Sequence, residues 1–256
     1  LGRVEILSNA QELIHKKFLS YLMRSYKYRH HVLATATGST VRHSSPTRIR
    51  NYSFSRPPIE EQRAIAHILG SLDDKIEANR RMNETLENTA RAIFKSWFVD
   101  FDPVHAKANG DIPEGMSSET ADLFPDDFQE SALGLIPRGW GVRPISEIIQ
   151  IIGGGTPKTS IDEYWNGDIP WYSVRDVPAN TDVWVLETEK TITQLGVDNS
   201  STKILPIGTT IISARGTVGK LALVGKPMGM NQSCYAIRGL EDDTDYYIFF
   251  LLRSSI

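Results

Sequence analysis

The sequence predicts an α/β chain in which one long helix separates two segments of mixed helix and strand. The first observation is a heptad pattern of apolar residues that runs without a break from Ile65 to Trp97. The second is a series of strand-like runs, divided by Gly, Pro and Asn, after residue 137. With 256 residues, 40% of them hydrophobic and 23% charged, the chain is long enough to bury a core without disulfides or metals.

The N-terminal segment is predicted to be helical at first and then loop-like. Residues 9–26 have the apolar spacing of a helix, and Asn9 and Glu12 have the spacing of a capping box. A second helical turn is expected over 31–37. The stretch that follows is basic and rich in turn residues, with a short strand expected over 48–54.

The clearest predicted element is a helix over 60–98. Pro57 and Pro58 suit its first turn, and Glu60 and Glu61 complement its positive end. At 1.5 Å per residue this helix would be roughly 58 Å long. Its length and regularity favour a spacer coiled coil over the alternative, a core helix of a bundle. The predicted coiled-coil interface, with two asparagines that would fix the register, consists of Ile65, Leu69, Leu72, Ile76, Asn79, Asn83, Leu86, Ala90, Ile93 and Trp97.

A second domain is predicted after the long helix. Residues 100–136 are acidic and rich in Pro, Gly and Ser, so we expect an irregular linker there. The domain opens at 137, has a short helix over 144–152 that ends at the glycine triplet 153–155, and closes on a helix over 244–254. Strand-like runs lie between, near 170–175, 183–187, 209–213, 220–225 and 233–238.

The net charge of −3 conceals a strong asymmetry along the chain. Residues 1–59 hold ten Lys and Arg against two acidic residues, whereas residues 60–140 carry an excess of acids. A basic segment can bind phosphates locally because exposed charges interact over only about 10 Å in salt. Uneven charge that serves only solubility is the alternative.

Cysteine content and hydrophobicity indicate the compartment. Cys234 is the only cysteine, which rules out an intrachain disulfide and favours a reducing, cytoplasmic location. No apolar run approaches the roughly 20 residues of a membrane span, so we expect no membrane partner. The chain begins with Leu1 rather than Met, which suggests a fragment of a longer protein or a chain whose start is missing, and a natural half-size protein is the alternative.

A short internal repeat links the two ends of the chain. FLSYLMRS at 18–25 matches YIFFLLRS at 247–254, with Arg24 and Arg253 aligned. Eight residues can match by chance, but both copies fall in predicted helices after strand-like stretches, which favours a true repeat. On that interpretation the chain starts near the end of one domain copy and stops at the same place in the next.

Five stretches carry a resemblance to a known family. They are PPIEEQRAIAHILGSLDDKIEANRRMNETLE (57–87), GLIPRGW (134–140), GGGTPKT with YWNGDIPWYSVRDV (153–177), LPIGTTIISARGTVGKLALV with MNQSCYAI (205–237) and GSTVRHSSPTRIRNYSFSRPP (38–58). The first resembles the conserved helical region of the specificity subunits of type I restriction–modification enzymes. The others resemble parts of the target recognition domains of those subunits. Their order around the heptad helix is more specific than any one motif.

The resemblance implies an architecture and a set of partners. Residues 1–59 would be the C-terminal part of a first target recognition domain, 60–99 the conserved spacer helix, 100–136 an acidic linker, and 137–256 a second, incomplete recognition domain. Subunits of this family bind double-stranded DNA by sequence, dock methyltransferase subunits and, through them, restriction subunits. They catalyse nothing themselves. They also carry a second conserved helix, which this sequence lacks.

The two glycine-rich motifs favour DNA contact over nucleotide binding. GGGTPKT has Lys158 where a phosphate-binding loop requires its second glycine, and GTVGK at 216–220 has the wrong spacing. The glycines of the first motif would let the backbone approach DNA, while its hydroxyl and amine groups bond to phosphates or base edges. A glycine-rich turn with solvated polar side chains is the alternative.

Other polar residues are candidates for reading or anchoring DNA. Arg215 and Lys220 flank a tight turn, where Arg215 would contact a guanine and Lys220 a phosphate. Ordinary surface charge is the alternative. Asn231 and Gln232 suit an adenine, or are turn residues. The predicted DNA-binding residues are Ser39, Thr40, Arg42, His43, Thr156, Lys158, Thr159, Ser160, Arg175, Arg215, Lys220, Asn231 and Gln232.

No catalytic constellation is recognised in the sequence. There is no base-methylation motif, no metal-dependent nuclease pattern and no G-x-S-x-G elbow. The histidines lack the spacing of metal ligands, so we expect neither metal nor cofactor. Trp171 and Tyr172 are expected in the core rather than stacked on bases. The leading hypothesis is a DNA specificity module that is not an enzyme. In it the apolar stripe from Ile65 to Trp97 would pair with a second copy in an antiparallel homodimer, with a missing downstream helix or with a methyltransferase subunit. The rivals are a coiled-coil adaptor that binds only protein and an enzyme with an unrecognised site.

Overall fold

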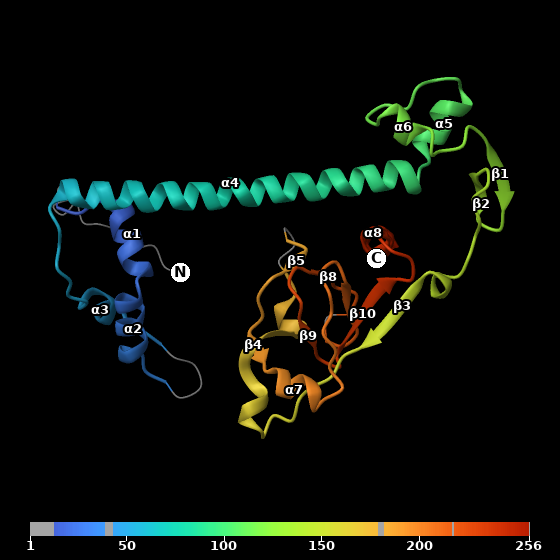
Figure 1. Cartoon of the computed structure of the whole chain (residues 1–256). Coiled ribbons are helices and arrows are strands. Elements are labelled where there is room, and N and C mark those ends of the chain that lie inside the picture. Colours follow the sequence, from blue (N-terminus) through green and yellow to red (C-terminus); the bar gives the residue numbers. More distant parts are fainter. Residues whose placement is uncertain (1–12, 39–42, 179–181, 217, 256) are drawn as a thin grey trace. The chain divides into compact units, whose positions relative to one another are not determined.

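The computed structural model divides into an N-terminal unit (1–81) and a C-terminal unit (82–256), with the boundary inside the long helix α4 (Ile59–Phe98) (Figure 1). Helices and β-sheet both occur, so the predicted α/β class and the long helix are confirmed. The structure describes residues 13–38, 43–178, 182–216 and 218–255.

The N-terminal unit begins with two consecutive helices, where the sequence predicted a helix over 9–26 and a separate helical turn over 31–37. α1 (Lys16–Arg24) ends at Ser25, and α2 (Tyr26–Thr35) follows at once. Ser25 has an extended backbone, and its hydroxyl accepts the N–H of Tyr28 at 3.3 Å, which caps α2. The prediction of one helix over 9–26 was therefore wrong at its end. The proposed capping box at Asn9 and Glu12 lies outside the described residues.

The strand expected over 48–54 is replaced by a short helix, α3 (Pro46–Arg50). The Ser45 hydroxyl accepts the N–H of Arg48 at 3.3 Å, and Pro46 occupies the first turn. Serine as N-cap followed by proline is a helix-start signal, and it outweighed the strand propensity of the residues that follow.

α1 contacts the first part of α4 through two polar residues of α4. The fully buried amide of Gln62 accepts the N–H of His15 at 2.9 Å and donates to the carbonyl of Leu13 at 3.2 Å. Asp73 accepts from the Tyr21 hydroxyl at 2.8 Å and from Arg24 at 3.0 Å. These bonds, that of Tyr21 first, hold the pKa of Asp73 below its usual value.

The C-terminal unit contradicts the prediction of an irregular linker over 100–136. Pro103 in the first turn of α5 and Ser117 as N-cap of α6 start short helices. Aromatic side chains then hold this segment to the end of α4, with Phe98 at ring-centroid distances of 6.1 Å from Phe124 and 6.2 Å from Trp140. The elements are α5 (Asp102–Ala108), α6 (Ser118–Ala121), β1 (Phe128–Ser131) and β2 (Gly134–Pro137).

Two further sheets form the body of the C-terminal unit. One has the order β3-β10-β7-β8-β5 and the other the order β6-β4-β9 (Figure 1). The bounds are β3 (Ile149–Gly153), β4 (Trp165–Tyr172), β5 (Trp184–Val185), β6 (Lys190–Ile192), β7 (Thr210–Ser213), β8 (Leu221–Val224), β9 (Gly229–Met230) and β10 (Cys234–Gly239). The short helices η2 (Ile145–Glu147), η3 (Asp162–Tyr164), η4 (Val174–Asp176) and α7 (Gln194–Asp198) connect them, and α8 (Asp245–Ser255) ends the unit.

The helix predicted over 144–152 was wrong. Only η2 is helical there, and β3 follows it because Ile151 and Ile152 pair with Ile237 and Ala236 of β10. Pairing with a partner strand more than 80 residues away decided this segment. The predicted strands near 170, 183, 209, 220 and 233 and the closing helix are confirmed, while β6 and β9 were not predicted.

The main core lies between the two sheets. Tyr172 and Met230 of the smaller sheet pack with residues such as Ile211, Val224 and Ala236 of the larger one, and each of these five side chains is at most 1% exposed. Trp171 is also buried, so the prediction that Trp171 and Tyr172 belong to the core is confirmed.

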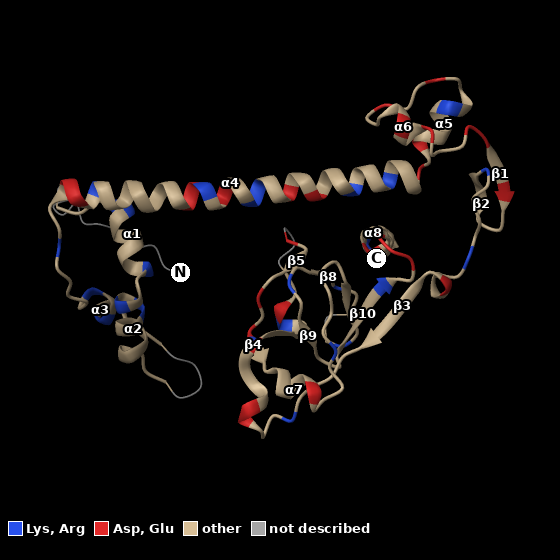
Figure 2. Ribbon diagram, in the orientation of Figure 1, with Lys and Arg blue, Asp and Glu red and all other residues tan. Residues whose placement is uncertain are grey.

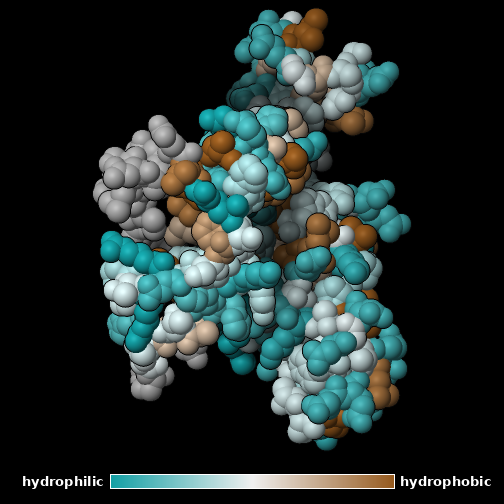
Figure 3. All heavy atoms as spheres, turned by 90° about the vertical axis from the view of Figure 1, so that its left-hand side faces the viewer, coloured by the Kyte–Doolittle hydropathy of each residue, from teal (hydrophilic) through white to brown (hydrophobic). Residues whose placement is uncertain are grey.

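Much of the predicted coiled-coil interface of α4 (Ile65 to Trp97), which we call the seam, is exposed. Leu72, Ile76 and Leu86 are 55%, 49% and 61% exposed. Nearer its two ends α4 instead buries Ala66 and Phe94, which lie beside the seam. Exposed hydrophobic side chains occur on other elements too, and Figure 3 shows them interspersed with hydrophilic ones on the face it presents. The seam therefore has no covering helix among the described residues of the chain.

Both copies of the predicted repeat lie on helices, and both use the aligned arginine in the same way. In the N-terminal unit Arg24 of α1 pairs with Asp73 of α4. In the C-terminal unit Arg253 of α8 pairs with Glu87 of α4. Each arginine thus binds a carboxylate of the long helix, which supports a true repeat over a chance match.

The charge asymmetry is visible on the ribbon. Lys and Arg lie on α1, α2 and α3, whereas Asp and Glu outnumber them over residues 100–136, which include α6 and β1 (Figure 2). No acidic residue occurs between Leu13 and Pro58. In the described part of the chain, no helix combines the length and the hydrophobicity of a membrane span.

Candidate nucleic-acid interface

Four loops leave the carboxyl ends of strands in the C-terminal unit, and we call them the strand-end loops. They comprise residues 154–160 after β3, 173–176 after β4, 214–220 after β7 and 231–233 after β9, with position 217 outside the described residues. β3 and β7 both run antiparallel to β10, so their carboxyl ends point the same way. β4 and β9 are parallel to each other. Each pair therefore delivers its loops to one edge of its sheet.

Hydrogen bonds join these loops into one cluster. In three places a backbone N–H group of one loop donates to a neighbouring loop or to the last residue of the strand before it, and the Thr156 hydroxyl donates to the Gln232 side-chain oxygen. The backbone bonds are Gly155 to Met230 at 2.8 Å, Asn231 to Tyr172 at 2.9 Å and Ala214 to Ser233 at 3.0 Å. The structure thus brings together motifs that are as much as 76 residues apart in sequence.

Two glycines of GGGTPKT, Gly154 and Gly155, lie against backbone atoms of neighbouring segments. A Cβ atom at Gly154 would lie 2.0 Å from the carbonyl oxygen of Asn231. A Cβ atom at Gly155 would lie 2.3 Å from the backbone nitrogen of Thr202. Neither space admits a side chain, so these positions require glycine for packing.

The cations of the cluster are available to a ligand. Lys158, Arg215 and Lys220 are exposed. Among the described residues, none of the three makes an ion pair or a side-chain hydrogen bond. Arg175 is exposed as well, but it pairs with Glu189 at 3.2 Å. Unpaired exposed cations at strand ends suit an anionic partner because no internal salt bridge must first be broken.

The predicted amide and hydroxyl groups have different surroundings. The Asn231 side chain accepts the N–H of Ser233 at 3.0 Å, which is the bond of a turn residue. Gln232 is exposed and bonded to Thr156, while Thr159 and Ser160 are exposed. Gln232 is therefore better placed than Asn231 to meet a base edge.

Lys190 is a cation near the loops that sequence reasoning missed. Its ammonium lies 5.5 Å from the centre of the Trp165 ring, in cation–π geometry. The Trp165 indole N–H in turn donates to the carbonyl of Lys158 at 3.2 Å. Lys190 and the loop of Lys158 thus share one tryptophan, an arrangement that the local sequence around Lys190 does not reveal.

The buried groups beneath the loops do not suit nucleophilic chemistry. Burial, together with the nearby carboxylate of Asp176, raises the pKa of the Cys234 thiol to about 11. Burial also raises the pKa of Tyr172. Both groups stay neutral near pH 7, where a reactive thiol would be ionised. In the described residues, no group of three or more His, Cys, Asp or Glu could hold a metal ion.

The predicted DNA-binding residues of the basic segment belong to the N-terminal unit. Ser39, Thr40 and Arg42 lie outside the described residues. His43 pairs with Thr37 through two backbone hydrogen bonds of 2.7 and 2.9 Å, which close the base of a loop.

The fold and the loops define a mixed α/β protein that presents exposed cations and polar side chains at one edge, as nucleic-acid-binding proteins do. The family model "Type I restriction modification DNA specificity domain" matches residues 3–88 and 137–256, more than half of the chain. The chain belongs to this family, which confirms the resemblance seen in the sequence.

Two relatives, both named as specificity subunits of type I restriction enzymes, support the assignment. The chain is 31% identical over 244 residues to the specificity subunit of the type I restriction enzyme HindI from Haemophilus influenzae, covering 80% of this chain and 52% of the relative. It is 33% identical over 128 residues to the MjaIX specificity subunit from Methanocaldococcus jannaschii, covering 50% and 30%. A type I S subunit structure from M. genitalium is 17% identical with a TM-score of 0.45, covering 95% and 54%. The chain spans about half the length of the HindI relative.

Proposed function

We propose that the chain recognises a double-stranded DNA target by its sequence, for a type I restriction–modification complex, and performs no catalytic step. The observation that carries this proposal is the cluster of strand-end loops, with exposed Lys158, Arg215 and Lys220 beside Gln232. Lys and Arg bind phosphates, and Arg and Gln pair with base edges in the major groove. Membership of a DNA specificity family supports the same function.

The division of labour along the chain is part of the proposal. Residues 1–59 end one target recognition domain, 60–99 form the spacer, and 137–256 begin a second recognition domain. Residues 100–136 link the two with ordered structure rather than irregular chain. Methyltransferase subunits dock on the assembly and bring restriction subunits with them, which is what the resemblance to type I specificity subunits implies.

The seam of α4 supports a further part of the proposal, an antiparallel homodimer. Leu72, Ile76 and Leu86 are about half exposed, and no other described segment offers a matching heptad run. Pairing of two α4 helices in opposite directions would bring the N-terminal unit of one copy beside the C-terminal unit of the other. Two recognition domains would then form by exchange, related by a two-fold axis that suits a bipartite target.

A binding titration at several salt concentrations tests DNA recognition against a protein-only adaptor. Random and selected duplexes are compared, with the chain alone and with methyltransferase subunits added. Specific recognition predicts a steep fall of affinity with salt, plus a sequence preference that persists at each salt concentration. If the chain binds no duplex either alone or with methyltransferase subunits, the protein-only adaptor is favoured. The exposed seam would then be its surface for binding another protein. Turnover by the pure chain with methyl donor, Mg²⁺ and ATP would contradict a non-catalytic role.

Two single substitutions separate base reading from phosphate binding. Arg215→Ala is expected to relax the preference at one base position by about 1–3 kcal/mol, the worth of one bidentate contact to a guanine. Lys158→Ala is expected to weaken binding to all sequences about equally and to lower the salt slope by about one. Titrations of a set of single-base variants of the selected duplex measure both effects. An Arg215→Ala chain with unchanged affinity and preference would show that this arginine does not contact the target.

A further inference from the structure

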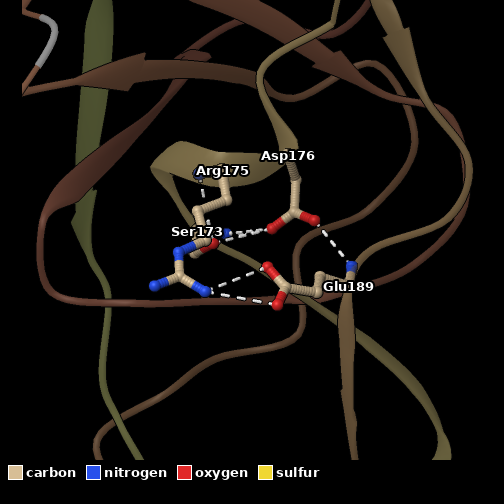
Figure 4. A network of polar contacts seen from close by, with 4 residues as sticks. All are labelled: Ser173, Arg175, Asp176 and Glu189. Atoms are coloured by element: carbon tan, nitrogen blue, oxygen red, sulfur yellow. Dashed lines mark hydrogen bonds and ion pairs between the residues drawn. The ribbon is translucent and has the colours of Figure 1, made fainter. Parts of the chain in front are cut away.

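One arginine of the strand-end loops differs from the other cations because the protein holds it in place. The Arg175 guanidinium donates through Nη1 to both carboxylate oxygens of Glu189, at 3.2 and 3.4 Å (Figure 4). Both side chains remain exposed, at 73% and 53%. An isolated ion pair this exposed contributes little to stability. The surrounding structure must therefore hold the two side chains in position.

The order comes from Asp176, which anchors both partners. One of its carboxylate oxygens accepts the N–H and the hydroxyl of Ser173, each at 2.8 Å, and so closes η4, which carries Arg175. The other oxygen accepts the N–H of Glu189 at 2.6 Å (Figure 4). A single carboxylate thus fixes the backbone on both sides of the ion pair. Because Asp176 itself is half-buried, the anchor belongs to the body of the domain rather than to a solvated loop.

The free edge of Arg175 has the geometry of a base reader. Only Nη1 contacts Glu189, and among the described residues no partner binds Nε or Nη2. These two nitrogens form one edge of the planar fork, which can donate two parallel hydrogen bonds to O6 and N7 of guanine. Figure 4 shows this edge directed away from Glu189.

The carboxylate beside Arg175 argues against a phosphate contact. A phosphate would bring negative charge close to Glu189, and like charges at that range repel. The edge of a guanine carries no net charge, so it can approach without that penalty. A fixed guanidinium also loses less side-chain entropy on binding than a free one. Both effects favour a base over the backbone of the DNA.

We propose that Arg175 reads a guanine in the target through its Nε and Nη2 edge, and that Glu189 is a positioning residue that sets the specificity of this contact. The inference rests on the proposed DNA recognition and adds the base that one residue selects. It also assigns a role to Glu189, which the sequence does not distinguish from other surface acids.

The test measures base preference and salt dependence together for the whole chain, with methyltransferase subunits where binding needs them. Arg175→Ala is expected to lose discrimination for guanine at one position by roughly 5- to 150-fold, the range for one bidentate contact. Its salt slope should stay that of the parent, since no phosphate contact is removed. Arg175→Lys should lose the same discrimination, because an ammonium lacks the two-nitrogen edge.

Glu189→Ala tests the positioning role. It should relax the same base position as Arg175→Ala, by a smaller factor, and add nothing when combined with it. A merely structural role would change stability and leave the preferred base unaltered. The matched control is Arg138→Ala, which removes another exposed arginine that pairs with an aspartate, Asp127, outside the strand-end loops. That variant should keep the parent's base preference.

Three results would overturn the inference while leaving DNA recognition intact. They are an Arg175→Ala chain that keeps its guanine preference, a salt slope lowered by about one with unchanged preference, and an Arg175→Lys chain as selective as the parent. The second result would identify a phosphate contact instead. A parent chain without any sequence preference would contradict the proposed function itself, and the inference with it.

Discussion

A chain that carries both Leu72→Asp and Leu86→Asp is expected to be monomeric at concentrations where the parent is a dimer. Both leucines lie on the predicted seam of α4 and are more than half exposed. Burial of one leucine side chain contributes about 1.5–3 kcal/mol, and a two-fold dimer would lose four of them. The dissociation constant should therefore rise by at least three powers of ten. Light scattering over a dilution series measures the change.

The control for this experiment adds the same charge to α4 away from the seam. Ser71 and Asn88 are exposed and occupy other heptad positions, so Ser71→Asp with Asn88→Asp should leave the dimer intact. A parent chain that is monomeric and still binds DNA specifically would contradict the exchanged dimer. The seam would then belong to a second helix of a longer subunit or to a methyltransferase subunit.

An element was predictable from the sequence where the spacing of its apolar residues alone indicates which of its side chains are buried. α4 carries ten apolar or amide positions at regular spacing over 65–97, and its bounds agree with the prediction to within a residue at each end. α8 and the strands β4, β5, β7, β8 and β10 were likewise found. In these elements the local pattern and the tertiary environment favour the same structure.

The errors arose where a remote partner or a side-chain cap decided the conformation. Over 144–152 the apolar spacing allows a helix, but antiparallel pairing of β3 with β10 makes a strand. Over 100–136 the composition suggests irregular chain, yet Phe124 and Trp140 pack against Phe98 and order the segment. Neither partner can be identified from spacing in one sequence. At α3 the signal was present, because Ser45 and Pro46 are a helix start.

The candidate site was predictable in its residues more than in its geometry. Glycine-rich turns and unpaired cations identified the loops of Lys158 and Arg215, since such residues concentrate where chains bind ligands. The pairing of Arg175 with Glu189 depends on Asp176, which reaches across 13 residues to the N–H of Glu189. That contact follows from how β4 and β6 lie together, and no motif encodes it.

The glycine triplet after β3 allows a sharp test of how the strand-end loops are held. Gly154→Ala is expected to lower the free energy of unfolding of the C-terminal unit by about 3 kcal/mol, at the upper end of the usual cost of overpacking. The new Cβ would lie 2.0 Å from the carbonyl oxygen of Asn231, and backbone atoms cannot yield as a flexible side chain can. Loop 231–233 must therefore move, and sequence-specific binding of DNA should fall with stability. Thermal unfolding followed by the near-ultraviolet signal of Trp165 and Trp171 measures the first effect.

Gly153→Ala is the matched control one residue earlier. A Cβ atom there meets nothing within 4 Å, and neither glycine has a φ in the left-handed region, so backbone strain is equal in the two variants. Gly153→Ala should be neutral or stabilise the unit by about 0.4–1 kcal/mol, because alanine restricts the unfolded chain. The difference between the two variants then measures the close approach of Gly154 to the backbone of Met230 and Asn231. Equal stability of the two would mean that loops 154–160 and 231–233 do not pack together, and the cluster of cations proposed to meet DNA would lose its support.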